Sequence, residues 1–300
     1  MCIRDRLVYC ADASPEGFDP GLWDSATTSN VTTQIFQGLV GHERGTTTLV
    51  PKLATAWSVS PDARTFTFTL RQGVAFHTTP YFKPTRAFNA DDVMFTFGSI
   101  LDPQHPYNQQ PVGTGHYQFK SYRKDDVLRL RPHPDYWGAA ARADALVYTF
   151  SKEPHVRVQK VARGECQVAA AIRDQDVASL QGHPQVQVLR MPALNISYLS
   201  FNLQREPTRR REVREALDIA IDRDALFKVL FPRGDAIQAT SAFPPSVPGF
   251  NRSLRNEFDP QRARQLLAQA GFPQGFEIDL WALPIARPTN PNGALMAQMI

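Results

Sequence analysis

The sequence predicts a mixed α/β fold that is long enough for two domains. Residues 65–70 alternate Thr with Phe and Leu, the pattern of a half-buried β-strand. Asn89 stands before Asp91 and Asp92, the arrangement expected at the start of a helix. Apolar residues between 213 and 221 recur at helical spacing. With 300 residues, of which 42% are hydrophobic, the chain can bury a sizeable core.

The same signals place the remaining elements in order. Helices are expected over residues 28–39, 90–100, 155–163, 213–221 and 225–230, the last following Asp224, and again from 294 to 300. Strands are expected over residues 7–10, 65–70, 128–132, 145–150, 186–189, 194–202 and, as a buried strand, 276–281. Trp57 and Val59 are expected to lie in an entry segment that leads into the turn before residue 65, and Trp57 gives this segment an aromatic side chain. Asp259 and Pro260 start another helix, which ends at Gly271.

Composition and motifs exclude several classes of function. The net charge is +4, and basic residues are scattered except at 209–211, whereas a nucleic-acid binder needs a basic face interleaved with aromatic residues. No stretch approaches the length of a membrane span. The seven histidines are dispersed, and Asp91 and Asp92 point about 100° apart around a helix. We therefore expect no nucleic-acid partner, no metal, no cofactor and no enzymatic activity.

Short motifs are spread along the whole chain. They are SPEGFDP at 14–20, PVGTG at 111–115, DYWG at 135–138, GECQV at 164–168, FDP at 258–260 with AG at 270–271, and LWALP at 280–284 leading into Arg287-Pro288. In this order they resemble the large solute-binding proteins of bacterial ABC transporters for peptides (family 5), in particular its dipeptide-binding branch. His116 replaces the proline that usually follows the PxGTG turn.

The resemblance implies a two-lobe fold of the type II periplasmic binding proteins. Residues 1–192 would form the first lobe and residues 193–300 the start of the second, which is truncated at Ile300. Family members carry several dozen more residues between Asn108 and Pro111, so we expect a gap in the first lobe and exposed strand edges and apolar surface around it. Residues 1–6 lack the character of a signal peptide and are expected to be a non-native start.

The resemblance also implies a function. Such a protein captures di- or oligopeptides in the periplasm by closing its two lobes, and delivers them to an inner-membrane ABC permease; a monomer is expected. Relatives with the same fold bind haem, glutathione or antimicrobial peptides, and these ligands remain alternatives. A non-functional fragment is a further alternative, favoured by the gap and the early stop.

Candidate binding residues come from the same resemblance. Arg287 matches the arginine that holds the ligand's carboxylate, a role suited to the guanidinium fork. Thr289 stands where the branch usually has tyrosine. Ser25, Ala26 and Thr27 match a loop that meets the ligand, with Ala26 in place of glycine. Their hydroxyls could bond the ligand's main chain, and Thr27 or Thr28 could equally be the N-cap of the next helix.

Two cysteines are expected to pair. In the family resembled, those matching Cys10 and Cys166 form a disulfide, which suits an oxidising periplasm. The alternative is two buried free thiols. Cys2 would be left unpaired.

Overall fold

The computed structural model describes residues 5–23, 25–99, 108–180, 182–190, 194, 196–231, 236–247, 249–251, 253–281 and 297–298. Two compact units divide the chain, Met1–Leu189 and Arg190–Ile300, and each is described by itself.

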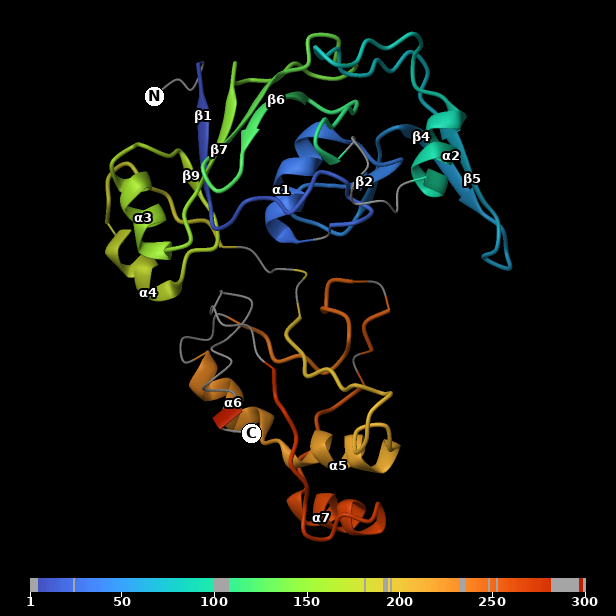
Figure 1. Cartoon of the computed structure of the whole chain (residues 1–300), viewed down its shortest axis with the longest axis vertical. Coiled ribbons are helices and arrows are strands. Elements are labelled where there is room, and N and C mark those ends of the chain that lie inside the picture. Colours follow the sequence, from blue (N-terminus) through green and yellow to red (C-terminus); the bar gives the residue numbers. More distant parts are fainter. Residues whose placement is uncertain are drawn as a thin grey trace. The chain divides into compact units, whose positions relative to one another are not determined.

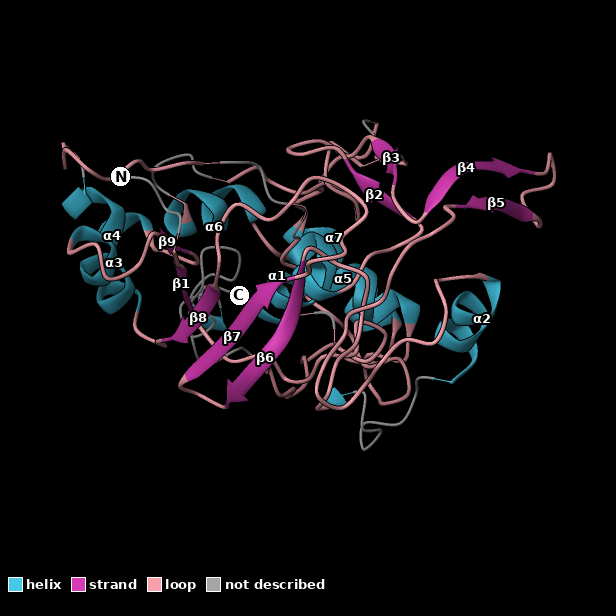
Figure 2. Cartoon of the chain, turned by 90° about the horizontal axis from the view of Figure 1, so that it is seen from above, coloured by secondary structure: helices cyan, strands magenta, loops and turns pink. Residues whose placement is uncertain are grey.

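A five-stranded mixed sheet organises the first unit, with the strand order β6-β7-β8-β1-β9. Figure 1 labels its strands β1, β6, β7 and β9. The strands are β1 Leu7–Ala11, β6 Tyr117–Arg123, β7 Val127–Pro132, β8 Leu146–Phe150 and β9 Val168–Ala169. Strand β1 lies between β8 and β9 and is parallel to both. β6 and β7 form an antiparallel hairpin that continues the sheet beyond β8, and Figure 2 shows the two strands side by side. The predicted strands at 7–10, 128–132 and 145–150 are confirmed within one or two residues.

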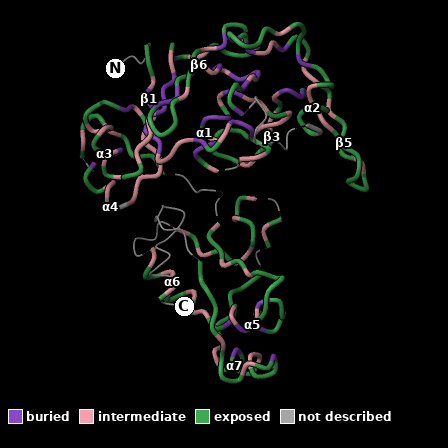
Figure 3. The backbone as a smooth tube through the Cα atoms, viewed as in Figure 1, coloured by how far each residue is buried: buried purple, intermediate pink, exposed green. Residues whose placement is uncertain are grey.

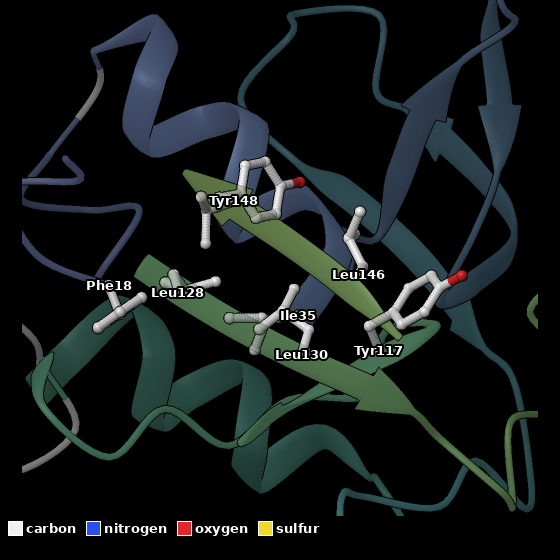
Figure 4. Packing of buried hydrophobic residues seen from close by; sticks show 8 residues of the cluster. Phe18, Ile35, Tyr117, Leu128, Leu130, Leu146 and Tyr148 are labelled. Carbon is white, nitrogen blue, oxygen red and sulfur yellow. The ribbon is translucent and has the colours of Figure 1, made fainter. Parts of the chain in front are cut away.

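Helices cover both faces of this sheet because side chains alternate along β1. Leu7 and Tyr9 pack on the core that contains Ile35 of α1 (Ala26–Ile35), and Figure 4 shows Ile35 beside Leu130 of β7 within this core. Val8 and Cys10 face the opposite side, where Val161 of α3 (Pro154–Ala162) packs. Figure 3 shows buried segments along β1 and within α1. The unit therefore has an α/β/α arrangement with its core around the central strands.

The Cys10–Cys166 pair implied by the resemblance is present. Cys10 lies on β1 and Cys166 just before β9, their Cα atoms are 6.0 Å apart, and the two residues are disulfide-bonded. Both are buried in the core between the sheet and α3. The bridge therefore ties the central strand to the end of the helical crossover.

Two small hairpins and a helix extend the first unit. They are β2 (Val40–His42) with β3 (Leu49–Pro51), β4 (Ala54–Val59) with β5 (Phe66–Leu70), and α2 (Ala90–Ser99). Asn89 caps α2 as predicted, accepting from the amide of Asp91 at 2.9 Å. The interpretation of residues 57–59 as an entry segment was wrong: Trp57 pairs with Phe68 across a two-stranded sheet.

Apolar side chains are exposed on these elements. Phe66 is 58% exposed, so the expected half-buried pattern fails at the start of β5. On α2, Met94 and Phe97 are 73% and 83% exposed. A two-stranded sheet has too few neighbours to bury the outer end of its strands.

The first unit ends with short helical turns, α4 (Asp174–Val177) and the 3₁₀ helix η2 (Ala178–Leu180). The strand predicted at 186–189 is wrong, because these residues are irregular and Leu189 is exposed. A strand is stable only when its backbone groups find a partner strand, and the sheet ladder ends at β9.

The second unit contains the helices α5 (Arg211–Ala220), α6 (Arg223–Leu230) and α7 (Pro260–Gln269). Ala216 and Ile219 of α5 pack on Ala263 of α7. Asp259 caps α7 as predicted, by accepting from the amide of Arg262 at 2.9 Å. Helix α6 starts earlier than expected, because Asp222 accepts from the amide of Ala225 and is its N-cap.

Two strands predicted in the second unit are wrong. The described residues of 194–202, and all of 276–281, are irregular, and Trp281 is 91% exposed. Every strand found in the described residues belongs to the first unit, so these extended segments have no ladder to join. The helix predicted from 294 lies largely outside the described residues.

Candidate functional site

The carboxyl ends of β8, β1 and β9 lie at one edge of the sheet because the three strands are parallel. Asp12 follows β1, Ser151 follows β8, and Ala170 follows β9. The connection after β1 leads to α1 on one face, and the connection after β8 leads to α3 on the other. Ligands of open α/β sheets bind where such connections diverge, outside the carboxyl ends of the strands. We call this part of the first unit the carboxyl edge.

The N-terminus of α1 lies beside this edge. Ser25 is the N-cap of the helix: its Oγ accepts from the amide of Thr28 at 3.3 Å. The interpretation of Thr27 or Thr28 as the N-cap was therefore wrong, because Ser25 has the extended backbone that a cap requires. Ser25 Oγ also donates to Glu16 Oε2 at 2.8 Å, and Thr28 Oγ1 donates to the same oxygen at 3.2 Å.

Thr27 connects the helix to the central strand. Its hydroxyl donates to Asp12 Oδ1 at 3.1 Å, and the side chain is buried. Ala26, between Ser25 and Thr27, is exposed. The structure thus brings Ser25, Ala26 and Thr27 together at the carboxyl edge, with both hydroxyls bonded to carboxylates of this chain. Arg287 and Thr289 lie outside the described residues.

A buried arginine that the sequence analysis did not single out lies at the same edge. Arg157 of α3 is 1% exposed and donates four hydrogen bonds to main-chain carbonyls. Two acceptors, Ser151 and Lys152, follow β8, and the other two, Ala170 and Ala171, follow β9. The only available signal was its place one residue before Val158 and four before Val161, on the apolar side of the predicted helix.

The electrostatics of the edge involve the same groups. Burial raises the pKa of Tyr9, the nearby Asp12 carboxylate raises it further, and the Arg157 guanidinium opposes the rise. Burial also raises the pKa of Tyr148, whose hydroxyl donates to the carbonyl of Asn30 at 2.8 Å. Both tyrosines therefore stay neutral and act as hydrogen-bonding groups at ordinary pH.

The buried histidines serve the fold. His77 Nδ1 accepts from the amide of Gly113 at 3.2 Å, so its Nε2 carries the proton and donates to Gly115 O at 3.0 Å. His133 Nδ1 donates to the same carbonyl at 3.1 Å. Burial lowers the pKa of His77 to about 4 and also lowers that of His133. The predicted turn at residues 111–115 is thus held by hydrogen bonds to these two buried histidines.

The chemistry of the carboxyl edge is that of binding. Its carboxylates can accept from amines and amide N–H groups of a ligand, and the hydroxyls, which donate to carboxylates and not to imidazoles, keep lone pairs that can accept from the same groups. Among the described residues, no three His, Cys, Asp or Glu side chains are placed to hold a metal ion. No helix within the described residues is long and apolar enough to span a bilayer.

The fold is that of the α/β periplasmic-binding class. The chain belongs to the bacterial extracellular solute-binding proteins, family 5, because the profile of that family's middle region matches residues 48–109 and 104–300. The two matched stretches overlap at residues 104–109. The members of this family are solute-binding proteins and not enzymes.

Individual relatives agree with the family. The dipeptide-binding protein of Escherichia coli (strain K12) is 33% identical over 367 residues, covering 98% of this chain and 68% of the relative. Haem-binding protein A of Haemophilus influenzae (strain Rd) is 31% identical and covers 99% of this chain and 68% of the relative. The crystal structure of a dipeptide-binding protein from Pseudoalteromonas sp. SM9913 with Met-Leu has a TM-score of 0.82 and 31% identity, covering 98% of this chain and 72% of that chain.

These alignments confirm the type II binding-protein fold and the shorter chain. The alignment with the Escherichia coli protein extends over 367 residues, whereas this chain has 300. The relative therefore carries dozens of residues that have no counterpart here.

Proposed function

We propose that this protein captures di- or oligopeptides in the periplasm and delivers them to an ABC permease of the inner membrane. The observation that carries the proposal is the likeness, over nearly the whole chain, to proteins named for dipeptide binding, one of them solved with Met-Leu. The Cys10–Cys166 disulfide supports an oxidising compartment. The protein acts as a monomer without a cofactor.

The carboxyl edge supports the proposal chemically. A binder that accepts many peptides must grip the groups that all peptides share, which are the amine, the carboxylate and the main-chain amides. The Asp12 and Glu16 carboxylates and the loop Ser25–Thr27 supply polar groups of this kind in the first unit. Arg287 is proposed to hold the ligand's carboxylate, with Thr289 close to the ligand's side chain.

Calorimetric titration of the full chain with Ala-Phe tests the proposal. Saturable binding with a 1:1 stoichiometry is expected, and the Arg287→Ala variant is expected to bind more weakly. An unchanged affinity in that variant would show that Arg287 does not hold the ligand. The absence of any heat of binding at millimolar Ala-Phe would contradict dipeptide capture.

Haem is the second candidate ligand, because the haem-binding protein of Haemophilus influenzae is 31% identical to this chain. An arginine that donates to a peptide carboxylate would also donate to a haem propionate. Titration with haemin, followed by its Soret absorbance, distinguishes the two. A shifted Soret band together with no response to Ala-Phe would favour haem over peptide.

A further inference from the structure

Arg157 holds the ends of two strands in a defined geometry. Its Nε donates to Ala170 O at 3.0 Å and its Nη2 to Ala171 O at 2.5 Å. Its Nη1 donates to Ser151 O at 2.5 Å and to Lys152 O at 3.0 Å. One guanidinium therefore joins the segment after β8 to the segment after β9. Burying such a charge is costly, and its hydrogen bonds offset that cost.

We propose that Arg157 is a positioning residue that turns four main-chain amides outward at the carboxyl edge, where they donate to acceptor groups of the ligand. These are the amides of Lys152, Glu153, Ala171 and Ile172. The acceptors are the carbonyl oxygens and the terminal carboxylate of an extended peptide. The inference rests on the proposed function and adds to it a group of contacts in the first unit.

The planar peptide bond fixes the direction of the amides that follow these four carbonyls. In a trans peptide, the N–H of each residue points opposite to the preceding C=O. The carbonyls of Ser151, Lys152, Ala170 and Ala171 all point at Arg157. The N–H groups of the residues that follow each of them therefore point away from the guanidinium.

The hydrogen bonds of the sheet end before these amides. The last ladder bonds at this edge run from Ser151 N to Ala11 O at 2.9 Å and from Ala170 N to Cys10 O at 3.3 Å. Beyond them, within the residues that the structure describes, the amides of Lys152, Glu153, Ala171 and Ile172 have no protein acceptor. Lys152 and Glu153 are exposed, and Ala171 and Ile172 are half-buried. These donors are accessible to a ligand or to water.

An arginine is required at position 157 to hold the four carbonyls. The planar guanidinium directs several N–H groups in fixed directions, and an ammonium cannot reproduce that fork. Ala171 has a φ of 53°, an uncommon conformation for a residue with a Cβ, and its carbonyl is one of the four acceptors. Arg157 thus holds a backbone geometry that these residues do not favour by themselves. Main-chain donors also suit a binder that tolerates different ligand side chains.

Amide NMR of the full ¹⁵N-labelled chain tests the inference without any mutation. Addition of Ala-Phe is expected to shift the resonances of Lys152, Glu153, Ala171 and Ile172 and to slow their exchange with solvent. If Ala-Phe shifts other amides of the chain but none of these four, the inference is wrong and the proposed function stands. If Ala-Phe shifts no amide, both are wrong.

Variants test the role of the side chain. Arg157→Met is expected to weaken Ala-Phe binding about tenfold or more, and Arg157→Lys to recover part of the loss. Arg71 is the matched control, because its Nε also donates to a carbonyl, that of Lys52, away from the carboxyl edge. Arg71→Met should change the unfolding curve and leave the affinity unchanged. Binding by Arg157→Met within twofold of the parent would overturn the inference. If that variant does not fold, the amide shifts of the parent decide.

Discussion

Thr27 donates its hydroxyl to the Asp12 carboxylate at 3.1 Å, and this contact joins the first turn of α1 to the end of β1. It fixes the loop Ser25–Thr27 against the carboxyl edge of the sheet. The loop is therefore positioned by the chain itself before any ligand arrives. Preorganisation of this kind reduces the entropy lost on binding.

Replacement of Thr27 by Val keeps the shape and removes the hydroxyl. We expect a loss of about 1 kcal/mol of unfolding free energy together with weaker Ala-Phe binding. Thr33→Val is the control, because the Thr33 hydroxyl donates to the Ser29 carbonyl of its own helix. Urea unfolding and calorimetry measure the two effects. Equal affinities for the two variants would show that Thr27 has no part in the proposed ligand site.

The Cys10–Cys166 bridge is expected to stabilise the first unit strongly. It spans 156 residues of sequence, and the chain-entropy model gives a contribution of about 4–5 kcal/mol for so long a loop. Reductant should therefore lower the urea midpoint of the parent. The Cys10→Ala/Cys166→Ala double variant should already have the lower midpoint and not respond to reductant. A parent that is equally insensitive would show that the bridge contributes little.

Gly115 is required by packing and not by its φ. A Cβ at this position would lie closer than 3.0 Å to Gln34 O, a main-chain atom that cannot move aside cheaply. Gly115→Ala is expected to lower the unfolding free energy by more than about 2 kcal/mol. Gly73→Ala is the contrast, because Gly73 has a φ of +71° but its added Cβ would meet nothing within 4 Å, so only about 1 kcal/mol is expected. A milder effect at Gly115 than at Gly73 would contradict the packing argument.

The buried His77 predicts a pH dependence of stability. Burial lowers its pKa to about 4 in the folded chain, whereas the unfolded value is about 6.5, so the unfolded state takes up the proton first. His77's contribution is therefore complete above pH 6.5 and is lost as the pH falls toward 4, by about 3 kcal/mol in total. His133, which shares the Gly115 carbonyl, adds a loss of the same sign.

Urea unfolding at about pH 7.5, 5.5 and 4.5 measures this dependence. The parent should lose stability steadily over this range. His77→Gln should be less stable at the highest pH but show a shallower fall, because the titrating group is gone. Parallel curves for parent and variant would refute the assignment.

Local signals in the sequence predict the parts of the fold that depend on neighbouring residues. Asn89 and Asp259 cap their helices as the pattern indicates, because a cap needs only the next three residues. Extended segments are different, since a strand needs a partner. Residues 276–281 have the composition of a buried strand and yet are irregular, whereas the strand that contains Trp57 was missed although it pairs with Phe68.

The candidate site was only partly accessible to sequence reasoning. The motif resemblance pointed to Ser25, Ala26 and Thr27, which the fold does bring to the carboxyl edge. It did not point to Arg157, because the four carbonyls that this side chain bonds come from segments about 20 residues apart that only the parallel sheet brings together. Nor did it reveal that Ser25, not Thr27 or Thr28, caps the helix.

Calorimetric titration of the full oxidised chain with Ala-Phe decides whether this protein captures dipeptides. We expect saturable 1:1 binding that weakens in Thr27→Val and in Arg157→Met and is unchanged in Thr33→Val. A chain that unfolds cooperatively but binds no Ala-Phe would contradict the claim that it captures dipeptides.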